Sequence, residues 1–368
     1  MRNLIRTVIQ AVARRMRGRP GDRGAVGVLI ALLLSSGVLL GMGALVIDVG
    51  QLYQNRAELQ NGADSAAFAV AKSCATGTCT PDVAAKYASA NAKSGTEGIS
   101  LVCGSGTLGT CPASTLALTD CPSAPTGDVS YVDVHTNTLT ASGSKLLPPV
   151  FARALPGMSG YEGSTVLACG QAEWGPAQTS SSPGLTISVC AWDSATASGS
   201  QFGTTVGLPF KSDAATCSGT GSGCDSSCGT STPGGFGWLP ADSSCQTAID
   251  LTTDESASDP GDSVTSACDT ALQQEVAAHT VVFLPVFTCV KGSGGSATYT
   301  FSGLAAFVIT GYKNIPGISG NVVPSGGSCP CADSSSCLYG YFTQALDPAS
   351  NQIGTGTDFG ATTMKLTG

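Results

Sequence analysis

One uninterrupted apolar stretch constrains this chain more than any other feature of its sequence. Residues 24–47 contain no charged side chain over 24 positions. As an α-helix rising about 1.5 Å per residue, the stretch would be roughly 36 Å long, which exceeds the hydrocarbon core of a bilayer at about 30 Å. Ser35 and Ser36 are its polar side chains, and serine hydroxyls can bond back to carbonyls of their own helix. The sequence therefore predicts a single transmembrane helix at 24–47.

The charges on either side of this stretch predict its orientation. Residues 1–23 hold seven arginines and one acidic residue, and the next charged residue is Asp48. A basic flank favours the cytoplasmic side, so we expect a single-pass protein of the cell membrane with a cytoplasmic N-terminus and an extracytoplasmic bulk. A cleaved signal peptide is the alternative, but its apolar core would span only about 7 to 15 residues. The longer run, which continues into helical periodicity, favours a retained anchor.

Composition separates the exported part from the basic tail. The net charge is −8, and residues 1–23 contribute +6 (seven Arg minus one Asp), so the remainder carries −14. This acidic balance argues against nucleic acid as a partner. All sixteen cysteines follow the apolar run, from Cys74 to Cys337. An even number on the exported side predicts up to eight disulfides, whose pairing stays open apart from a local bridge that could join Cys74 and Cys79.

Helical periodicity continues beyond the apolar run. Apolar residues recur at spacings of three and four or their sums, at Val49, Leu52, Leu59, Ala63, Ala66 and Val70. We therefore expect a nearly continuous helix over residues 24–72. Small residues line part of it, at Ala57, Ala63, Ala66, Ala67, Ala69 and Ala71. This small-residue face fits either packing against the chain's own core or a helix–helix assembly contact.

The residues of this helix also carry a family resemblance. The run Arg23-Gly24-Ala25, the apolar span, VIDVGQLY at 46–53 and ELQNGADSAA at 58–67 resemble the N-terminal module of TadE/TadG-like proteins. These proteins belong to the Flp (tight adherence, Tad) pilus assembly system, and the resemblance covers about residues 20–75. It implies a non-catalytic, membrane-anchored component that anchors or organises the pilus machinery at the cell envelope.

The resemblance also implies partners and contact residues. The expected partners are other Tad/Flp assembly proteins or pilins and the membrane, with the cell surface as a further contact. Asp48, Gln60 and Asp64 are the candidate assembly contacts, against a structural or solvated role for each. Asp48 also fits a position at the headgroup level, just past the apolar run.

Two other functions stay open. A minor pilin-like subunit of the fibre would need a prepilin leader, which ends in Gly and is followed by Glu at the fifth mature position. Here the fifth residue after Gly24 is Leu29, and no acid lies between Gly24 and Asp48, which argues against such processing. An anchored envelope enzyme or carbohydrate-binding protein would have to build its site from scattered residues.

Motifs that would indicate catalysis or metal binding are missing from the sequence. The two histidines, His135 and His279, lack the spacing of a paired metal or catalytic motif, and no nucleophile elbow, H-E-x-x-H, P-loop or dinucleotide fingerprint occurs. The cysteine clusters at 217–228 and 329–337 lack a paired C-x2-C knuckle and favour disulfides over zinc. Nor does the D-x-S-x-S metal motif of the von Willebrand A-type domain, which some TadG-like proteins carry, appear in full. We therefore predict no enzyme, catalytic residue, cofactor or metal.

Patterning predicts an α+β fold with a disulfide-rich, mainly β outer region. We divide the chain into a basic tail (1–23), the transmembrane helix (24–47), a helical extension with a small α+β layer (48–174), a linker (175–184) and a disulfide-rich β domain (185–368). Expected helices lie at about 80–95, 145–155 and 269–278, and expected strands at 129–138, 164–174, 185–192, 280–290 and 297–312. Residues 95–125 are turn-like, and 217–245 form a Cys-, Gly- and Ser-rich excursion.

The larger aromatic residues of the outer region allow two interpretations. They either pack in its core or form an adhesive face, since aromatic rings supply large, rigid contact area. The residues in question are Trp192, Phe236, Trp238, Tyr339 and Tyr341.

Overall fold

The computed structural model describes most of the chain. The described residues are 23–35, 38–92, 97–112, 121–127, 129–140, 142–154, 158–210, 236–253, 255–257, 266–291, 298–325, 331 and 334–367. The basic tail up to residue 22 and most of the excursion expected at 217–245 lie outside them.

Two helices occupy the region where one nearly continuous helix was expected. Helix α2 spans Arg23–Ser35 and helix α3 spans Val38–Ala75, with residues 36–37 outside the described part. The Ser35 hydroxyl bonds back to the Leu32 carbonyl at 3.0 Å, as expected for a serine in an apolar helix. Over the described ranges, no helix combines the length and the apolar character needed to cross a bilayer.

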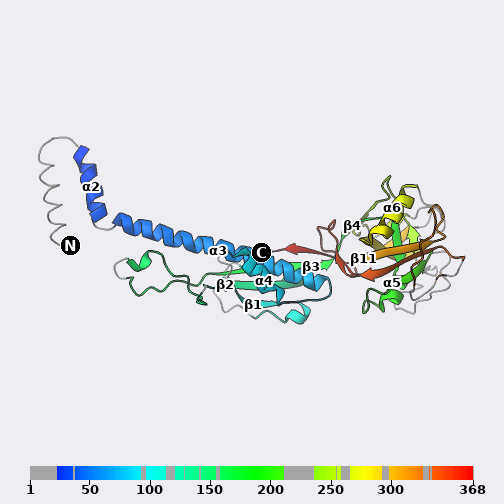
Figure 1. Cartoon of the computed structure of the whole chain (residues 1–368), viewed down its shortest axis with the longest axis horizontal. Helices are drawn as coiled ribbons and strands as arrows, with labels where there is room; N and C mark the ends of the chain where they lie inside the picture. The colour runs from blue at the N-terminus through cyan, green and yellow to red at the C-terminus, as the bar shows by residue number, and fades with distance from the viewer. Residues whose placement is uncertain are drawn as a thin grey trace.

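Helix α3 packs on a five-stranded sheet. The strands are β1 (Glu97–Gly104), β2 (Ser130–Thr138), β3 (Leu167–Pro176), β13 (Ala345–Leu346) and β14 (Ala361–Leu366), in the order β1-β2-β3-β14-β13. All neighbours pair antiparallel except β13 and β14. The C-terminal part of α3 and helix α4 (Val83–Asn91) lie on this sheet, and Figure 1 shows them side by side along it.

The core between α3 and the sheet explains the small-residue face. Ala63, Ala66, Ala67 and Ala71 of α3 are all fully buried, together with Val70. They pack against Val132, Val134, Ala172 and Trp174 of the sheet and against Ala84 and Ala88 of α4. Most of the small-residue face is therefore core packing, because small side chains let the helix approach the strands closely.

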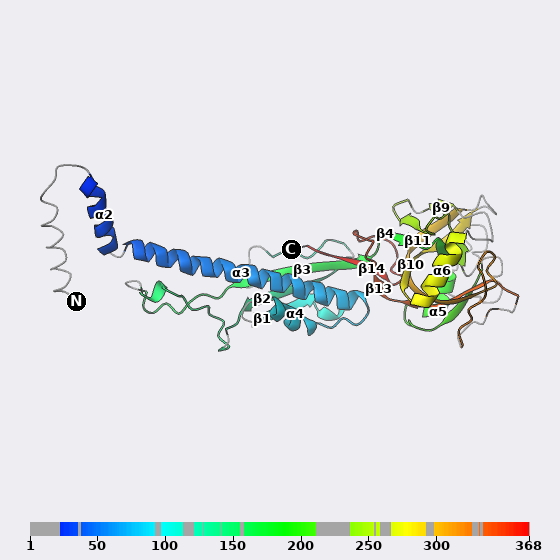
Figure 2. The ribbon, with the colours of Figure 1, turned by 45° about the horizontal axis from the view of Figure 1, so that its top comes forward.

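A seven-stranded sheet forms the outer region. Its strands are β5 (Leu185–Ser188), β6 (Val206–Pro209), β7 (Phe236–Trp238), β9 (Glu255–Ala257), β10 (Val281–Lys291), β11 (Thr298–Lys313) and β12 (Cys337–Thr343). The order is β6-β12-β11-β10-β5-β7, and β9 pairs with β11. Strands β10 and β11 confirm the two strands expected at 280–290 and 297–312, and they pair antiparallel. Helices α5 (Val189–Thr196) and α6 (Ser266–Ala278) flank it, and Figure 2 shows this region at the far end of the molecule from α2.

Pro285 lies inside a sheet and not at its edge. Strand β10 pairs with β11 on one side and with β5 on the other, and the register of the hairpin shifts just after Val286. The Thr186 hydroxyl donates to the Pro285 carbonyl at 2.7 Å. A local irregularity thus accommodates a residue that lacks a ladder donor.

The chain crosses between the two sheets twice. In place of a linker at 175–184, β3 ends at Pro176 and strand β4 (Thr179–Ser182) pairs with β8 (Thr247–Asp250). The chain later returns, and β14 pairs with β3 in the α3-bearing sheet. The final strand of the region 185–368 thus belongs to the sheet built mainly from residues 97–176. Strand pairing over such sequence distances leaves no local signal.

Three local predictions were wrong. In place of the helix expected at 145–155, the described residues 145–154 form a loop with a short 3-10 turn, η3 (Ala152–Ala154), because consecutive prolines disfavour helix there. The strand expected at 185–192 ends at Ser188, whose side chain accepts a hydrogen bond from the Ala191 amide and caps α5. The turn-like stretch 95–125 contains β1 and the 3-10 turn η2 (Gly106–Leu108).

The expected disulfide framework is present among the described residues. Five bridges have both partners there, namely Cys74–Cys79, Cys103–Cys111, Cys121–Cys169, Cys245–Cys268 and Cys331–Cys337. The first closes the turn between α3 and α4, as predicted. The third joins the segment before β2 to β3.

Candidate functional site

Helix α3 has a covered face and an open face. Its covered face buries Leu59, Ala63 and Val70, none more than 4% exposed. The opposite side exposes 73% of Tyr53 and 41% of Phe68, two large side chains that a helix seldom leaves in water without a partner. The exposed Ala57 and Asn61 lie between them at helical spacing. We call Tyr53, Ala57, Asn61 and Phe68 the open face of α3.

Asp48 of α3 holds a loop that is distant in sequence. Its Oδ1 accepts hydrogen bonds from the amides of Val150 at 2.8 Å and Phe151 at 3.0 Å, and its Oδ2 accepts one from Ala152 at 2.6 Å. The carboxylate is 9% exposed. Three successive amides that converge on one carboxylate form an anion-binding concavity, and here the protein supplies its own anion. Asp48 is therefore a docking residue between α3 and the β2–β3 loop.

Gln60 and Asp64 also serve contacts inside the chain. Gln60 Nε2 donates to the Asp64 carboxylate at 2.9 Å and to the Cys169 carbonyl of β3 at 2.7 Å. Burial raises the pKa of the Asp64 carboxyl, although the Gln60 hydrogen bond opposes that change. The structure thus places both residues where α3 meets β3, about four helical turns beyond Asp48. Their assembly role stays a prediction.

The backbones of β3 and α3 approach so closely at Gly170 that only glycine fits there. A Cβ atom built on Gly170 of β3 would lie 2.6 Å from the Ala63 carbonyl carbon and 2.7 Å from the Asp64 amide nitrogen. Real Cβ atoms do not approach other atoms so closely, so a side chain at Gly170 would push the helix away from the sheet. The contact between α3 and β3 therefore depends on this glycine.

Glu97 is the residue that sequence reasoning missed at this site. It begins β1, is 7% exposed, and its carboxylate lies against Gly62 of α3, where a Cβ would meet Glu97 Cδ at 2.6 Å. Burial, and to a smaller extent the nearby Glu58, raise its pKa to about 7 against the lowering effect of Thr136. The alternation of Ile99, Leu101 and Cys103 was the available signal for β1.

Comparison with known protein families identifies this helix. Residues 24–73 match the family model described as "Putative Flp pilus-assembly TadE/G-like". These residues are TadE/G-like. The search found no matching curated protein and no matching solved structure. The family match supports involvement of the chain in Flp pilus assembly.

The TadE/G-like segment, residues 24–73, coincides with α2 and nearly all of α3. It contains the three predicted contact residues and the open face, and it ends two residues before α3 does. The sheet that packs on α3 lies outside the matched residues. The family match therefore covers the helical segment and not the sheet that packs on it.

A polar cluster occupies the face of the first sheet opposite the TadE/G-like segment. Gln171 Nε2 donates to Asp133 at 2.9 Å, and the Asp133 carboxylate lies 3.5 Å from Cys111 Sγ. Burial raises the pKa of Asp133 and lowers that of His135, two residues along the same strand. Cys103 and Cys111 lie close enough to Asp133 to share an ion, but they form a disulfide, and metal binding needs thiolates.

The aromatic residues of the outer sheet pack in its core. Trp192, Phe236, Trp238 and Tyr339 are all less than 9% exposed, and Tyr341 is half-buried. Trp192 donates to the Phe359 carbonyl at 3.0 Å and meets the Phe359 ring edge-on at 4.9 Å. Of the two interpretations, core packing is the one that the structure supports for these residues.

Proposed function

We propose that this chain is a non-catalytic, single-pass membrane component that anchors or organises Flp pilus assembly through the open face of α3. The TadE/G-like match supports the pilus system, and the charge pattern around residues 24–47 supports the anchor. The cytoplasmic side then holds the arginine-rich tail. The disulfide-bonded remainder lies on the extracytoplasmic side, where such bridges persist.

Exposed side chains lend further support to the anchor. Large apolar residues at both ends of the run 24–47 are open to the surroundings, including Val26 at 64%, Leu32 at 62% and Val46 at 70%. Apolar exposure on this scale is stable in a bilayer and unfavourable in water. The α3 helix would then carry the sheet and the outer region away from the membrane.

The open face of α3 is the observation that carries the proposed assembly role. Within the TadE/G-like segment, one side of the helix is committed to the chain's own core, and the other exposes Tyr53 and Phe68. Aromatic residues flanked by small ones suit helix packing, because the rings fill the space that the small side chains leave. A pilin helix or another Flp assembly protein is the partner that we propose for this face.

The buried titratable groups support a non-catalytic role. Asp64 and Glu97 have raised pKa values because of burial within the packing of α3 and the first sheet. Burial inside a structural interface shifts pKa values without creating a site that a substrate can reach.

A piliation assay tests the proposal. The host strain is deleted for the gene and complemented with the full chain or with the double variant Tyr53→Ser, Phe68→Ser. Tyr87→Ser is the matched control, since Tyr87 of α4 is 44% exposed but lies outside the TadE/G-like segment. We expect the double variant to lose most pili at an unchanged protein level in washed membranes, and the control to keep them.

Three results would contradict the proposal. Normal piliation with the double variant would remove the assembly role from the open face. Release of the protein from washed membranes would remove the anchor. A chain recovered from sheared pili and beginning at Ala25 would assign it to the fibre as a minor pilin-like subunit.

A further inference from the structure

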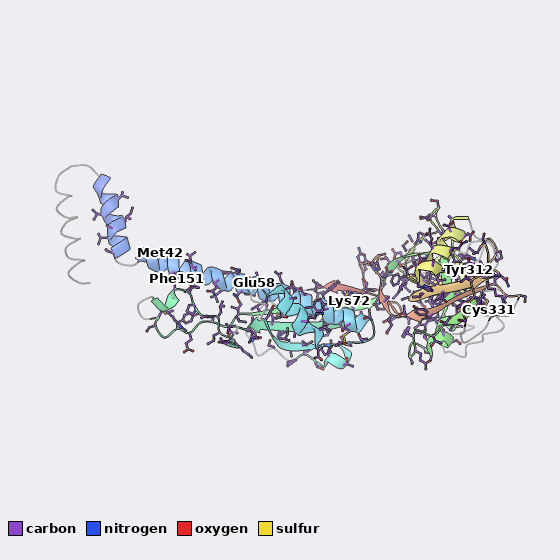
Figure 3. All side chains as sticks on the ribbon, viewed as in Figure 1. Met42, Glu58, Lys72, Phe151, Tyr312 and Cys331 are labelled. Carbon is purple, nitrogen blue, oxygen red and sulfur yellow. A yellow bond between two sulfur atoms is a disulfide. The ribbon has the colours of Figure 1, made fainter. Side chains whose placement is uncertain are left out.

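The β2–β3 loop, residues 139–166, extends back along α3 towards the apolar run. Two backbone hydrogen bonds between Leu147 and Ser164, at 2.9 and 3.3 Å, close it into a narrow hairpin. Arg153 Nε donates to the Tyr161 carbonyl at 3.0 Å and ties its two arms together again. Figures 1 and 2 both show this loop beside the N-terminal half of α3, and Figure 3 places Phe151 near Met42.

Asp48 fixes the far end of this hairpin at a defined level of α3. The three amides that bond to the Asp48 carboxylate belong to residues 150–152, at the turn into η3. Asp48 is also the first charged residue after the run 24–47. A span of that length places its final residues at the boundary between acyl chains and headgroups, so the hairpin end is held at the same boundary.

The held end of the hairpin exposes apolar side chains. We call Val150, Phe151 and Met158 the apolar tip; they are 55%, 44% and 40% exposed. Leu146, just before the Leu147–Ser164 bonds on the same arm, is 36% exposed. The adjoining turns of α3 expose Val46, Ile47 and Val49 to 70%, 50% and 39%. The bonds to Asp48 thus bring the exposed apolar side chains of the tip next to the end of the apolar run. An exposed patch of this kind marks a surface that contacts a membrane or another protein.

Two cations favour a membrane as the occupant. Lys145 lies beside Leu146 and Arg153 lies just after Phe151, and both side chains are exposed. Long basic side chains next to apolar ones are typical of the bilayer interface, where the stems lie among acyl chains and the charges reach the phosphates.

We propose that the apolar tip is a second membrane contact, which inserts into the headgroup boundary of a phospholipid bilayer beside α3. Lys145 and Arg153 then bind lipid phosphates. This inference rests on the proposed membrane anchoring. A helix alone can rotate about its axis in the bilayer, whereas a helix with a second contact fixed to it through Asp48 cannot. The contact therefore determines which way the open face of α3 points.

Quenching by brominated lipids tests the contact. The full chain carrying Phe151→Trp is reconstituted in phosphatidylcholine–phosphatidylglycerol vesicles with or without bromine on the acyl chains, and the emission of the wild-type chain is subtracted. We expect a loss of emission comparable to that of Leu32→Trp, a reporter inside the apolar run. Tyr87→Trp on α4 is the control for a surface away from lipid and is expected to keep its emission.

The reporters separate failure of this contact from failure of the anchor. An unquenched Phe151→Trp together with a quenched Leu32→Trp overturns the second contact and leaves the anchor intact. An unquenched Leu32→Trp overturns the anchoring and, with it, the contact. Adding Asp48→Asn to Phe151→Trp should reduce the quenching, because the loop is released; unchanged quenching would refute the role of Asp48 in positioning the tip.

Crosslinking in cells distinguishes lipid from protein at the tip. A benzoylphenylalanine incorporated at position 151 should crosslink to phospholipid. A crosslink to a polypeptide in place of lipid would overturn the proposal and identify the surface as a protein interface.

Discussion

Glu97 makes the packing of β1 on α3 depend on pH. Its carboxylate is 7% exposed and lies against Gly62, and burial raises its pKa from 4.5 to about 7. In the unfolded chain the group titrates near its ordinary value. Between about pH 4.5 and 7, the folded protein therefore binds a proton that the unfolded chain has released.

The sign of the effect follows from this difference. The folded pKa is higher than the unfolded one, so the stabilisation is complete below pH 4.5 and is lost as the pH rises through 7. A difference of about 2.5 pKa units, at about 1.36 kcal/mol per unit, corresponds to a free energy of unfolding that falls by up to about 3 kcal/mol.

Glu97→Gln tests this reasoning because glutamine keeps the shape of a protonated glutamate and does not titrate. The difference in unfolding free energy between variant and wild type should grow in favour of the variant by up to about 3 kcal/mol from pH 4.5 to pH 8. Glu162→Gln is the control, since Glu162 is exposed on the β2–β3 loop.

Hydrogen exchange of the full chain in detergent provides the assay. The exchange rates are first corrected for the intrinsic pH dependence of amide exchange. From pH 4.5 to pH 8, protection of the β1 and α3 peptides in the wild-type protein should then fall by up to about two orders of magnitude relative to Glu97→Gln. If amide protection changes with pH in the same way in wild type and Glu97→Gln, the reasoning is refuted, because the pKa of Glu97 is then the same in the folded and unfolded chains.

Three further perturbations address other contacts of α3 and the first sheet. Gly170→Ala should lower the unfolding free energy by about 1–3 kcal/mol in thermal melts, since its Cβ would overlap α3, whereas Gly160→Ala, with open space around it, should change little. Replacing Cys121 and Cys169 by serine removes a bridge with a sequence separation of 48 and should lower the unfolding free energy, measured by chemical denaturation, by about 4 kcal/mol. Removing the Cys74–Cys79 bridge, with a sequence separation of 5, should lower it by about 2 kcal/mol. Asp48→Asn should speed hydrogen exchange in residues 150–152 and leave β14 unchanged, and equal exchange in both proteins would contradict the docking role.

Local pattern was sufficient for several elements of the fold. The apolar periodicity of α3, the alternation in β2 and the two long apolar strands of the outer hairpin all predicted the observed structure. Each of these signals repeats within a single element. The bridge between Cys74 and Cys79 was equally accessible, because only a short turn separates its partners.

Local pattern failed where a residue's environment comes from distant sequence. For Asp48 nothing in the sequence indicated its hydrogen-bond partners, which lie more than 100 residues away, at 150–152. Glu97 was missed because its burial depends on Gly62 and on the approach of α3. Gln60 and Asp64 were chosen from family resemblance, which marks residues without distinguishing internal from external contacts.

By itself the sequence determined a charge-free run, a long helix with one apolar face, a cysteine-rich part that follows this run and the TadE/G-like resemblance of residues 24–73. Each of these depends on neighbours along the chain. Only the tertiary structure decided which face of α3 is covered and which is open, and where the β2–β3 loop is held. Strand β14 returns to pair with β3. The hydrogen bond from the Thr362 hydroxyl to the Ala75 carbonyl, at 3.3 Å, joins residues 287 positions apart. Such contacts form because the whole chain must bury its apolar faces and satisfy its buried polar groups together, which no short segment specifies.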